Sequence, residues 1–160
     1  GVDATNTEAI QRLNRLKGRV KPLSIVLESV DHMHDFAEFD GDIKSEINKL
    51  FPGAYTVLLP SKKSDLSPLV QNGSPNIGVR IPDHLFPIQL VKLLSKPLIT
   101  TSINRHGSEP LNDVTQVEID FPNIDIFEDL NHNQSKGSTI IDYSISPPEV
   151  IRDGDGPYPL

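Results

Sequence analysis

The sequence contains no cysteine and no tryptophan, and methionine occurs once among its 160 residues. The absence of cysteine excludes disulfide bonds, zinc–thiolate sites and a thiol nucleophile. No run approaches the roughly 20 apolar residues that a membrane-spanning helix needs, so no membrane partner is predicted. The first residues carry neither the basic nor the apolar region of a secretory signal. Together these absences fit a cytoplasmic protein.

The charge balance is acidic overall but uneven along the chain. The formal net charge of -7 argues against a protein whose whole surface binds nucleic acid. A local cationic segment nevertheless lies within ten residues, at Arg12, Arg15, Lys17, Arg19 and Lys21. Such a segment suits a small anion, but a solvated helix face has the same pattern and, on spacing alone, is the interpretation that we favour.

Hydrophobic periodicity predicts an alternation of helices and short strands. Helical spacing after a capping box at Thr5 and Glu8 predicts a helix that ends near Gly18. Two more helices are expected, one through Ile47 and one capped by Asp83. Strands are expected at 24–28, 55–59, 77–81, 97–101, 125–130, 138–143 and 150–152. We therefore predict one α/β domain over residues 1–160, with helices packed on a twisted mixed sheet.

Several polar residues occupy positions that favour ligand binding. Arg80 lies inside an apolar strand, where an unpaired charge is costly, so it needs an anionic partner from the protein or from a ligand. The run from Thr100 to Asn104 directly follows a strand, where open α/β sheets bind ligands, although an ordinary turn has the same composition. Ser138 opens a strand and Arg152 closes one. None of these features is decisive alone.

The common catalytic fingerprints are absent. The sequence has no Gly-x-x-x-x-Gly-Lys-Ser/Thr loop, no Gly-x-Gly-x-x-Gly fingerprint and no Gly-x-Ser-x-Gly elbow. His32 and His34 lack further ligands at metal spacing, and we predict no protein metal site. We also predict no side-chain nucleophile.

Six segments in order resemble the YrdC family of threonylcarbamoyl-adenylate synthases. Each motif is common by itself, but their shared order over nearly the whole chain is specific. The matching segments are Lys17-Gly18-Arg19 together with Pro22-Leu23 as one motif, the run from Pro52 to Thr56, the run from Ile77 to Pro82, Thr101-Ser102-Ile103-Asn104, the run from Ser138 to Asp142, and Ile151-Arg152-Asp153-Gly154.

This resemblance implies a YrdC-like α/β fold around a basic cavity and a nucleotidyltransferase activity. Such enzymes make threonylcarbamoyl-AMP and pyrophosphate from L-threonine, bicarbonate and ATP. The threonylcarbamoyl group then reaches tRNA through the threonylcarbamoyl transferase machinery, to form the t6A modification. ATP is thus implied as a substrate, with Mg²⁺ held mainly by its phosphates.

The resemblance also implies roles for individual residues. Arg80, Thr100 and Ser138 would line the threonine end of the cavity, with Arg80 paired to the carboxylate. The residues implied for ATP are Lys17, Arg19, Lys21, Ser102, Asn104 and Arg152.

The match fails at the N-terminus and leaves alternative functions open. The family strand ending in Pro-Thr-Asp/Glu-Thr-x-Tyr-Gly is expected before Gly1, and the printed sequence begins without it. We therefore expect residues 1–160 alone to lack part of the threonine pocket and to be unstable or inactive. One alternative is a YciO-like protein that binds a nucleotide or RNA without synthase activity. Another is a carbamoyl-transfer relative that uses carbamoyl phosphate.

Overall fold

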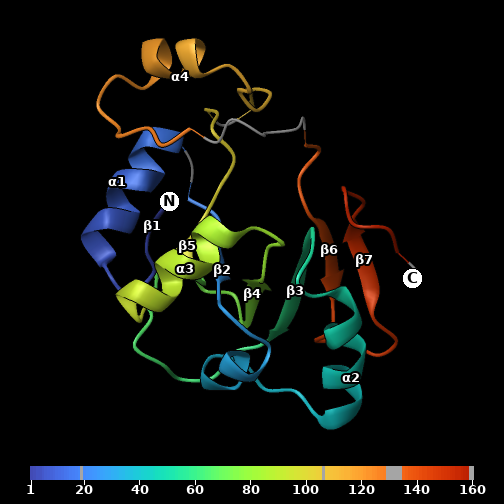
Figure 1. The fold of residues 1–160 in the computed structure, drawn as a ribbon. Helices are drawn as coiled ribbons and strands as arrows, with labels where there is room; N and C mark the ends of the chain where they lie inside the picture. The colour runs from blue at the N-terminus through green and yellow to red at the C-terminus, as the bar shows by residue number, and fades with distance from the viewer. Residues whose placement is uncertain (19, 106, 129–134, 159–160) are drawn as a thin grey trace.

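The computed structural model describes residues 1–18, 20–105, 107–128 and 135–158 (Figure 1). Within these ranges the chain forms seven strands, four α-helices and one short 3-10 helix. In chain order the elements are β1 (Val2–Asp3), α1 (Thr7–Lys17), β2 (Ser24–Val26), η1 (Asp31–Asp35), α2 (Gly41–Leu50), β3 (Tyr55–Pro60), β4 (Asn76–Arg80), α3 (Leu85–Leu94), β5 (Leu98–Ile99), α4 (Val114–Asp120), β6 (Thr139–Asp142) and β7 (Glu149–Arg152).

The strands form one mixed sheet in the order β1-β5-β2-β4-β3-β6-β7. The β2–β4 and β3–β6 pairs are parallel, and the remaining neighbours are antiparallel. Each parallel pair joins segments that are far apart in sequence, and helices lie in the connections. The α/β class and the mixed sheet predicted from the sequence are confirmed.

Strict alternation along the central strands gives the sheet two different faces. Odd-numbered side chains point into the hydrophobic core, because successive residues of a strand project to opposite sides. These core residues are Ile25, Val57, Leu59, Ile77, Val79 and Ile141. Even-numbered residues, including Ser24, Thr56, Gly78 and Arg80, line a cavity on the opposite face. The alternation of side chains along each strand therefore determines which residues face the cavity and can contact a ligand.

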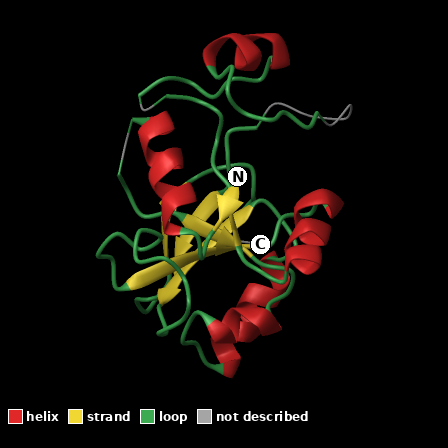
Figure 2. Cartoon of the chain, turned by 90° about the vertical axis from the view of Figure 1, so that its left-hand side faces the viewer, coloured by secondary structure: helices red, strands yellow, loops and turns green. Residues whose placement is uncertain are grey.

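The helices cover these two faces unequally. Ile10 and Leu13 of α1 and Ile47 of α2 belong to the core on the odd-numbered face. Val91 of α3 packs instead against Val26 and Leu98 on the other face, over β2 and β5. Figure 2 shows the helices around the sheet, with α4 standing apart from it at the end of long loops. The even-numbered face beside α3 is consequently left open.

Both predicted N-caps are wrong by one residue. Asn6, and not Thr5, caps α1 by accepting a hydrogen bond from the backbone N–H of Ala9. Thr5 is held elsewhere, because its N–H and hydroxyl both donate to Asp3. At α3 the imidazole of His84 accepts from the N–H of Phe86, so His84 takes the position predicted for Asp83.

Other boundaries follow the sequence more closely. Gly18 ends α1 in the left-handed conformation, with φ of 66°, as its position predicts. The segment 114–117, too short to assign from sequence, is the start of α4. The strand predicted at 125–130 does not form in its described part, residues 125–128. Among the described helices none has the length and apolar character needed to cross a membrane.

Candidate functional site

A cavity of about 670 Å³ lies over the even-numbered face of the sheet. Its floor comes from β2, β3, β4 and β6, and its walls from residues 100–103, 110–112 and 135–138. Three cations, Arg80, Lys136 and Arg152, line it, and its described lining contains no aspartate or glutamate. An enclosed surface with cations, hydroxyls and amides but no carboxylate favours an anionic ligand.

Arg80 stands at the carboxyl end of β4 with few partners of its own. Its Nη1 donates to the Thr100 hydroxyl over 3.2 Å, while its buried Nε has no hydrogen-bond partner. Burial, and secondarily the charge of Arg152, lower the pKa of Arg80. No described carboxylate pairs with its guanidinium. A guanidinium without a carboxylate partner, under the influence of a second cation, is a site that an oxyanion would complete.

Arg152 at the end of β7 is held by the start of β6. Its Nε and Nη2 both donate to the carbonyl oxygen of Ser138, over 3.0 and 2.6 Å. Nη2 also donates to the Ser138 hydroxyl over 3.1 Å. A Cβ at Gly154 would collide with the backbone of Gly137 and Ser138, so glycine is required for this close approach. The guanidinium of Arg152 is therefore fixed before any ligand arrives.

Thr56 belongs to the same cluster, although sequence reasoning assigned it no role. Its hydroxyl lies 2.6 Å from that of Ser138, and both side chains are buried. Thr56 and Ile140 are register partners in the parallel β3–β6 pair, which brings Ser138 beside Thr56. The alternation along β3 could have predicted this position. Val57 is apolar and faces the core, so the adjacent Thr56 faces the open side of the sheet.

Gly78 forms the middle of the cavity floor, between Ser24 on β2 and Leu58 on β3. A Cβ at this position would lie 3.2 Å from the Leu58 Cδ2 atom and 3.2 Å from the Ser24 Cβ. These distances are tight, so any side chain here would displace neighbours or fill the cavity. Glycine keeps the floor open.

The residues predicted for ATP separate into two groups. Ser102 and Arg152 line the cavity, whereas Lys17 and Asn104 are absent from its lining. The buried Lys17 Nζ donates to the Ser102 carbonyl and to the Asn104 side-chain oxygen, each over 2.5 Å. Lys17 thus ties the end of α1 to the segment that forms one wall.

The remaining predicted residues divide in the same way. All three residues predicted for threonine, Arg80, Thr100 and Ser138, line the cavity together. Lys21 is exposed and is absent from the lining, so the structure does not bring it to the cavity. Arg19 lies outside the described residues.

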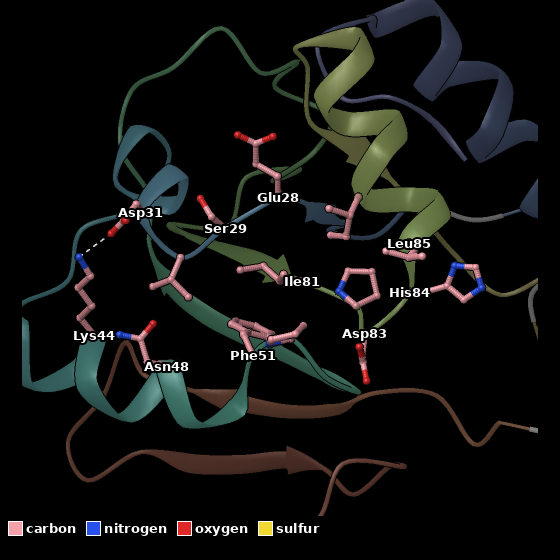
Figure 3. Close-up of a pocket in the computed structure, with 14 residues that line it drawn as sticks. Glu28, Ser29, Asp31, Lys44, Asn48, Phe51, Ile81, Asp83, His84 and Leu85 are labelled. Carbon is pink, nitrogen blue, oxygen red and sulfur yellow. Dashed lines mark hydrogen bonds and ion pairs between the residues drawn. The ribbon is translucent and has the colours of Figure 1, made fainter.

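A second cavity, of about 790 Å³, lies at the carboxyl ends of β2 and β4, between α2 and α3 (Figure 3). Glu28, Asp31 and Asp83 line it, and its one described lysine, Lys44, is paired with Asp31 at 2.6 Å. The balance of charge is negative, opposite to that of the first cavity. We therefore take the cavity around Arg80 as the candidate site for an anion.

An open-faced mixed sheet whose cavity offers arginines and hydroxyls defines an α/β domain built to hold an anionic ligand. The chain belongs to the Sua5/YciO/YrdC family, whose model carries the description "Telomere recombination" and matches residues 1–154. This match confirms the family resemblance found in the sequence motifs.

Individual relatives agree with this family. The threonylcarbamoyl-AMP synthase of Photobacterium profundum is 32% identical over 123 residues, which are 74% of this chain and 66% of that enzyme. P. abyssi Sua5, solved with L-threonine, is 26% identical with a TM-score of 0.84, over 96% of this chain and 46% of its own. E. coli YciO, at 23% identity, has the same fold, with a TM-score of 0.86 over 98% of this chain and 78% of its own.

The chain is shorter than these relatives. It spans 32%, 66% and 53% of the length of the threonylcarbamoyl-AMP synthases of Bacillus subtilis, Photobacterium profundum and Mus musculus.

Proposed function

We propose that this chain carries the catalytic site of an L-threonylcarbamoyladenylate synthase. The observation that carries the proposal is the pair Arg80 and Arg152, which face one cavity without a described carboxylate in its lining. A substrate that brings both a carboxylate and phosphates supplies the missing anions. The names of the relatives, and the L-threonine bound to P. abyssi Sua5, support this choice of substrates.

The proposed reaction needs no nucleophile from the protein. The threonine amine is first carboxylated by bicarbonate, with loss of water. An oxygen of the resulting carbamate then forms a bond to the α-phosphorus of ATP, and the bond to the leaving pyrophosphate breaks. Negative charge grows on the phosphate oxygens, so fixed cations and hydroxyl donors are the groups that accelerate this step. The enzyme is in this proposal a nucleotidyltransferase whose product serves tRNA modification through partner proteins.

The described residues have distinct tasks in this scheme. The guanidinium of Arg80 lines the cavity and is the cation available for the threonine carboxylate, while its Nη1 also donates to the Thr100 hydroxyl. Arg152, held by Ser138, presents a fixed positive charge to the phosphates. Because both cations are in place in advance, little reorganisation is needed when the ligands bind.

A magnesium ion bound to ATP would neutralise part of the phosphate charge. No group of three or more histidine, aspartate or glutamate side chains suited to a metal exists among the described residues. Hydroxyl and amide oxygens of the cavity lining are ligands that suit Mg²⁺, and in this proposal the phosphates hold most of the ion. Ser102, which the family resemblance assigns to ATP, is the hydroxyl that would lie near such a complex.

Pyrophosphate release by the purified full-length protein tests this function. With ATP and bicarbonate present, L-threonine should stimulate release and L-serine should do so much less. Arg80→Ala removes the carboxylate partner and is expected to lower the threonine-dependent rate by about tenfold to a hundredfold. Arg12→Ala removes an exposed cation from α1, outside the cavity lining, and should leave the rate unchanged.

The alternatives give different results in the same assay. Nucleotide binding without threonine-dependent release would contradict the synthase and favour a YciO-like binding protein. Release of carbamoyl groups from carbamoyl phosphate, with no use of bicarbonate, would favour a carbamoyl-transfer relative.

A further inference from the structure

The Thr56 and Ser138 hydroxyls form a buried pair at the edge of the cavity. Their oxygens lie 2.6 Å apart, and the two residues are 4% and 5% exposed. The pair joins β3 to the start of β6, between segments 82 positions apart in the chain. Only Ser138 also contacts Arg152, so the two hydroxyls are not equivalent.

The direction of this hydrogen bond decides which of the two hydroxyl hydrogens is left for a ligand. A hydroxyl has one hydrogen and two acceptor positions. The Ser138 oxygen already accepts from Nη2 of Arg152 over 3.1 Å. Thr56 and Ser138 both line the cavity, so the hydrogen that is not shared between them is the one available to a ligand. Because Ser138 is the hydroxyl that contacts Arg152, an anion held there is best met by the Ser138 hydrogen, and Thr56 is then the donor of the shared bond.

We propose that Thr56 is a positioning residue, which turns the Ser138 hydroxyl into an obligatory donor aimed at a substrate oxygen. With Thr56 and Arg152 both donating to it, the Ser138 oxygen has no acceptor position left. Its own hydrogen is free and faces the cavity that Ser138 lines. The position therefore accepts a carboxylate or phosphoryl oxygen and rejects an ammonium or hydroxyl donor. This inference rests on the proposed synthase function and refines it.

The substitution Thr56→Val keeps the shape of the side chain and removes the donor. Without that donor the Ser138 hydroxyl can rotate and donate to other acceptors, so the KM for threonine or ATP should rise by about fivefold to tenfold. Thr56→Ser keeps a hydroxyl and should restore the wild-type KM. In a Ser138→Ala background Thr56→Val should add nothing, because Thr56 acts only through Ser138.

The Thr7–Ser67 pair supplies a matched control. It is also a threonine–serine hydroxyl contact, at 2.9 Å, but it joins α1 to a loop away from the cavity lining. Thr7→Val should lower the Tm slightly and leave both KM values unchanged. Equal KM effects from Thr56→Val and Thr7→Val, or full additivity of Thr56→Val with Ser138→Ala, would overturn the positioning role.

A measurement independent of catalysis separates this inference from the function on which it rests. Neutron diffraction of the deuterated protein locates the hydroxyl deuterium in the Thr56–Ser138 pair. A deuterium on Thr56 that points to Ser138 supports the inference even if no threonine-dependent pyrophosphate release is found. A deuterium on Ser138 that points to Thr56 overturns it, whatever the activity.

Discussion

Arg80 and Arg152 face the same cavity from strands that are not neighbours in the sheet, since β3 and β6 lie between β4 and β7. Burial and the charge of Arg152 together lower the pKa of Arg80. The protein thus maintains two cations at close range without a described carboxylate to compensate them in the cavity lining. This repulsion is a free-energy cost of the unliganded state, and an anion that bridges the two guanidinium groups removes it.

Multivalent anions should therefore stabilise the folded protein. Pyrophosphate at a hundredfold excess over its Kd adds about 2.7 kcal/mol to the free energy of unfolding, because it binds the folded state. Thermal unfolding monitored by circular dichroism measures the resulting rise in Tm. Arg152→Met should abolish most of this rise, while Arg12→Met on the exposed side of α1 should retain it. A rise that survives Arg152→Met would place the anion elsewhere.

The cavity floor should tolerate no side chain at Gly78. In Gly78→Ala the new methyl group would lie 3.2 Å from both Leu58 and Ser24, so we expect a destabilisation of about 1–3 kcal/mol and a higher KM for threonine. Urea unfolding and steady-state kinetics measure the two effects. Gly41→Ala is the control, because no atom lies within 4 Å of a Cβ at that first residue of α2. A Gly78→Ala enzyme with unchanged kinetics would contradict the assigned floor.

Lys17 should act as a structural tie for one wall of the cavity. Lys17→Met keeps most of the aliphatic volume but removes the two hydrogen bonds from Nζ to Ser102 and Asn104. We expect about 1–3 kcal/mol of lost stability, together with weaker ATP binding in isothermal titration. Lys21→Met alters an exposed lysine outside the lining and should change neither quantity. If both variants lost stability and ATP affinity equally, Lys21 would have to be assigned to the ATP site.

Acid should loosen the segment 135–137 at the cavity wall. The Asp155 carboxylate accepts hydrogen bonds from the Ser135 hydroxyl and the Lys136 N–H, and these contacts lower its pKa. A carboxylate whose pKa is lower in the folded state adds stability above its unfolded value of about 3.9. That stability disappears as the pH falls through the folded pKa. Below that pH we expect weaker protection of these amides.

Carbon-13 NMR titration of the Asp155 carboxyl group tests this expectation directly. Asp155→Asn should remove part of the pH dependence of stability below about pH 4. Asp153→Asn, at an exposed neighbouring position, serves as the comparison. An Asp155 carboxyl that titrates at its ordinary value would show that the hydrogen bonds to Ser135 and Lys136 are weak in solution.

Local patterns were sufficient to predict much of the fold and part of the site. Alternating apolar residues indicated the strand around Arg80, and an arginine at that place required an anion or an internal partner. The Thr56–Ser138 contact was beyond such reasoning, because it depends on the register between β3 and β6. The Lys17–Asn104 contact, over 87 positions, likewise depends on tertiary packing.

Short-range errors had a different cause. Asn6 and Thr5 are both good N-cap residues, and the choice was decided by Asp3, which holds the hydroxyl and N–H of Thr5. The cap of α3 is an imidazole, a residue type that cap preferences do not favour. Competition between adjacent polar residues is settled by contacts that composition does not specify.

Arg80 and Ile81 are consecutive, yet Arg80 lines the cationic cavity and Ile81 lines the acidic one. Successive residues along the strand face opposite sides of the sheet. A single-residue insertion or deletion inside β4 would therefore turn Arg80 and Ile81 each to the side that the other now occupies. The guanidinium would then enter the apolar core, and an aliphatic side chain would replace it at the anion. Length variation in this family is therefore expected in the loops and not in β4, where only changes in multiples of two residues keep each side chain on its own side.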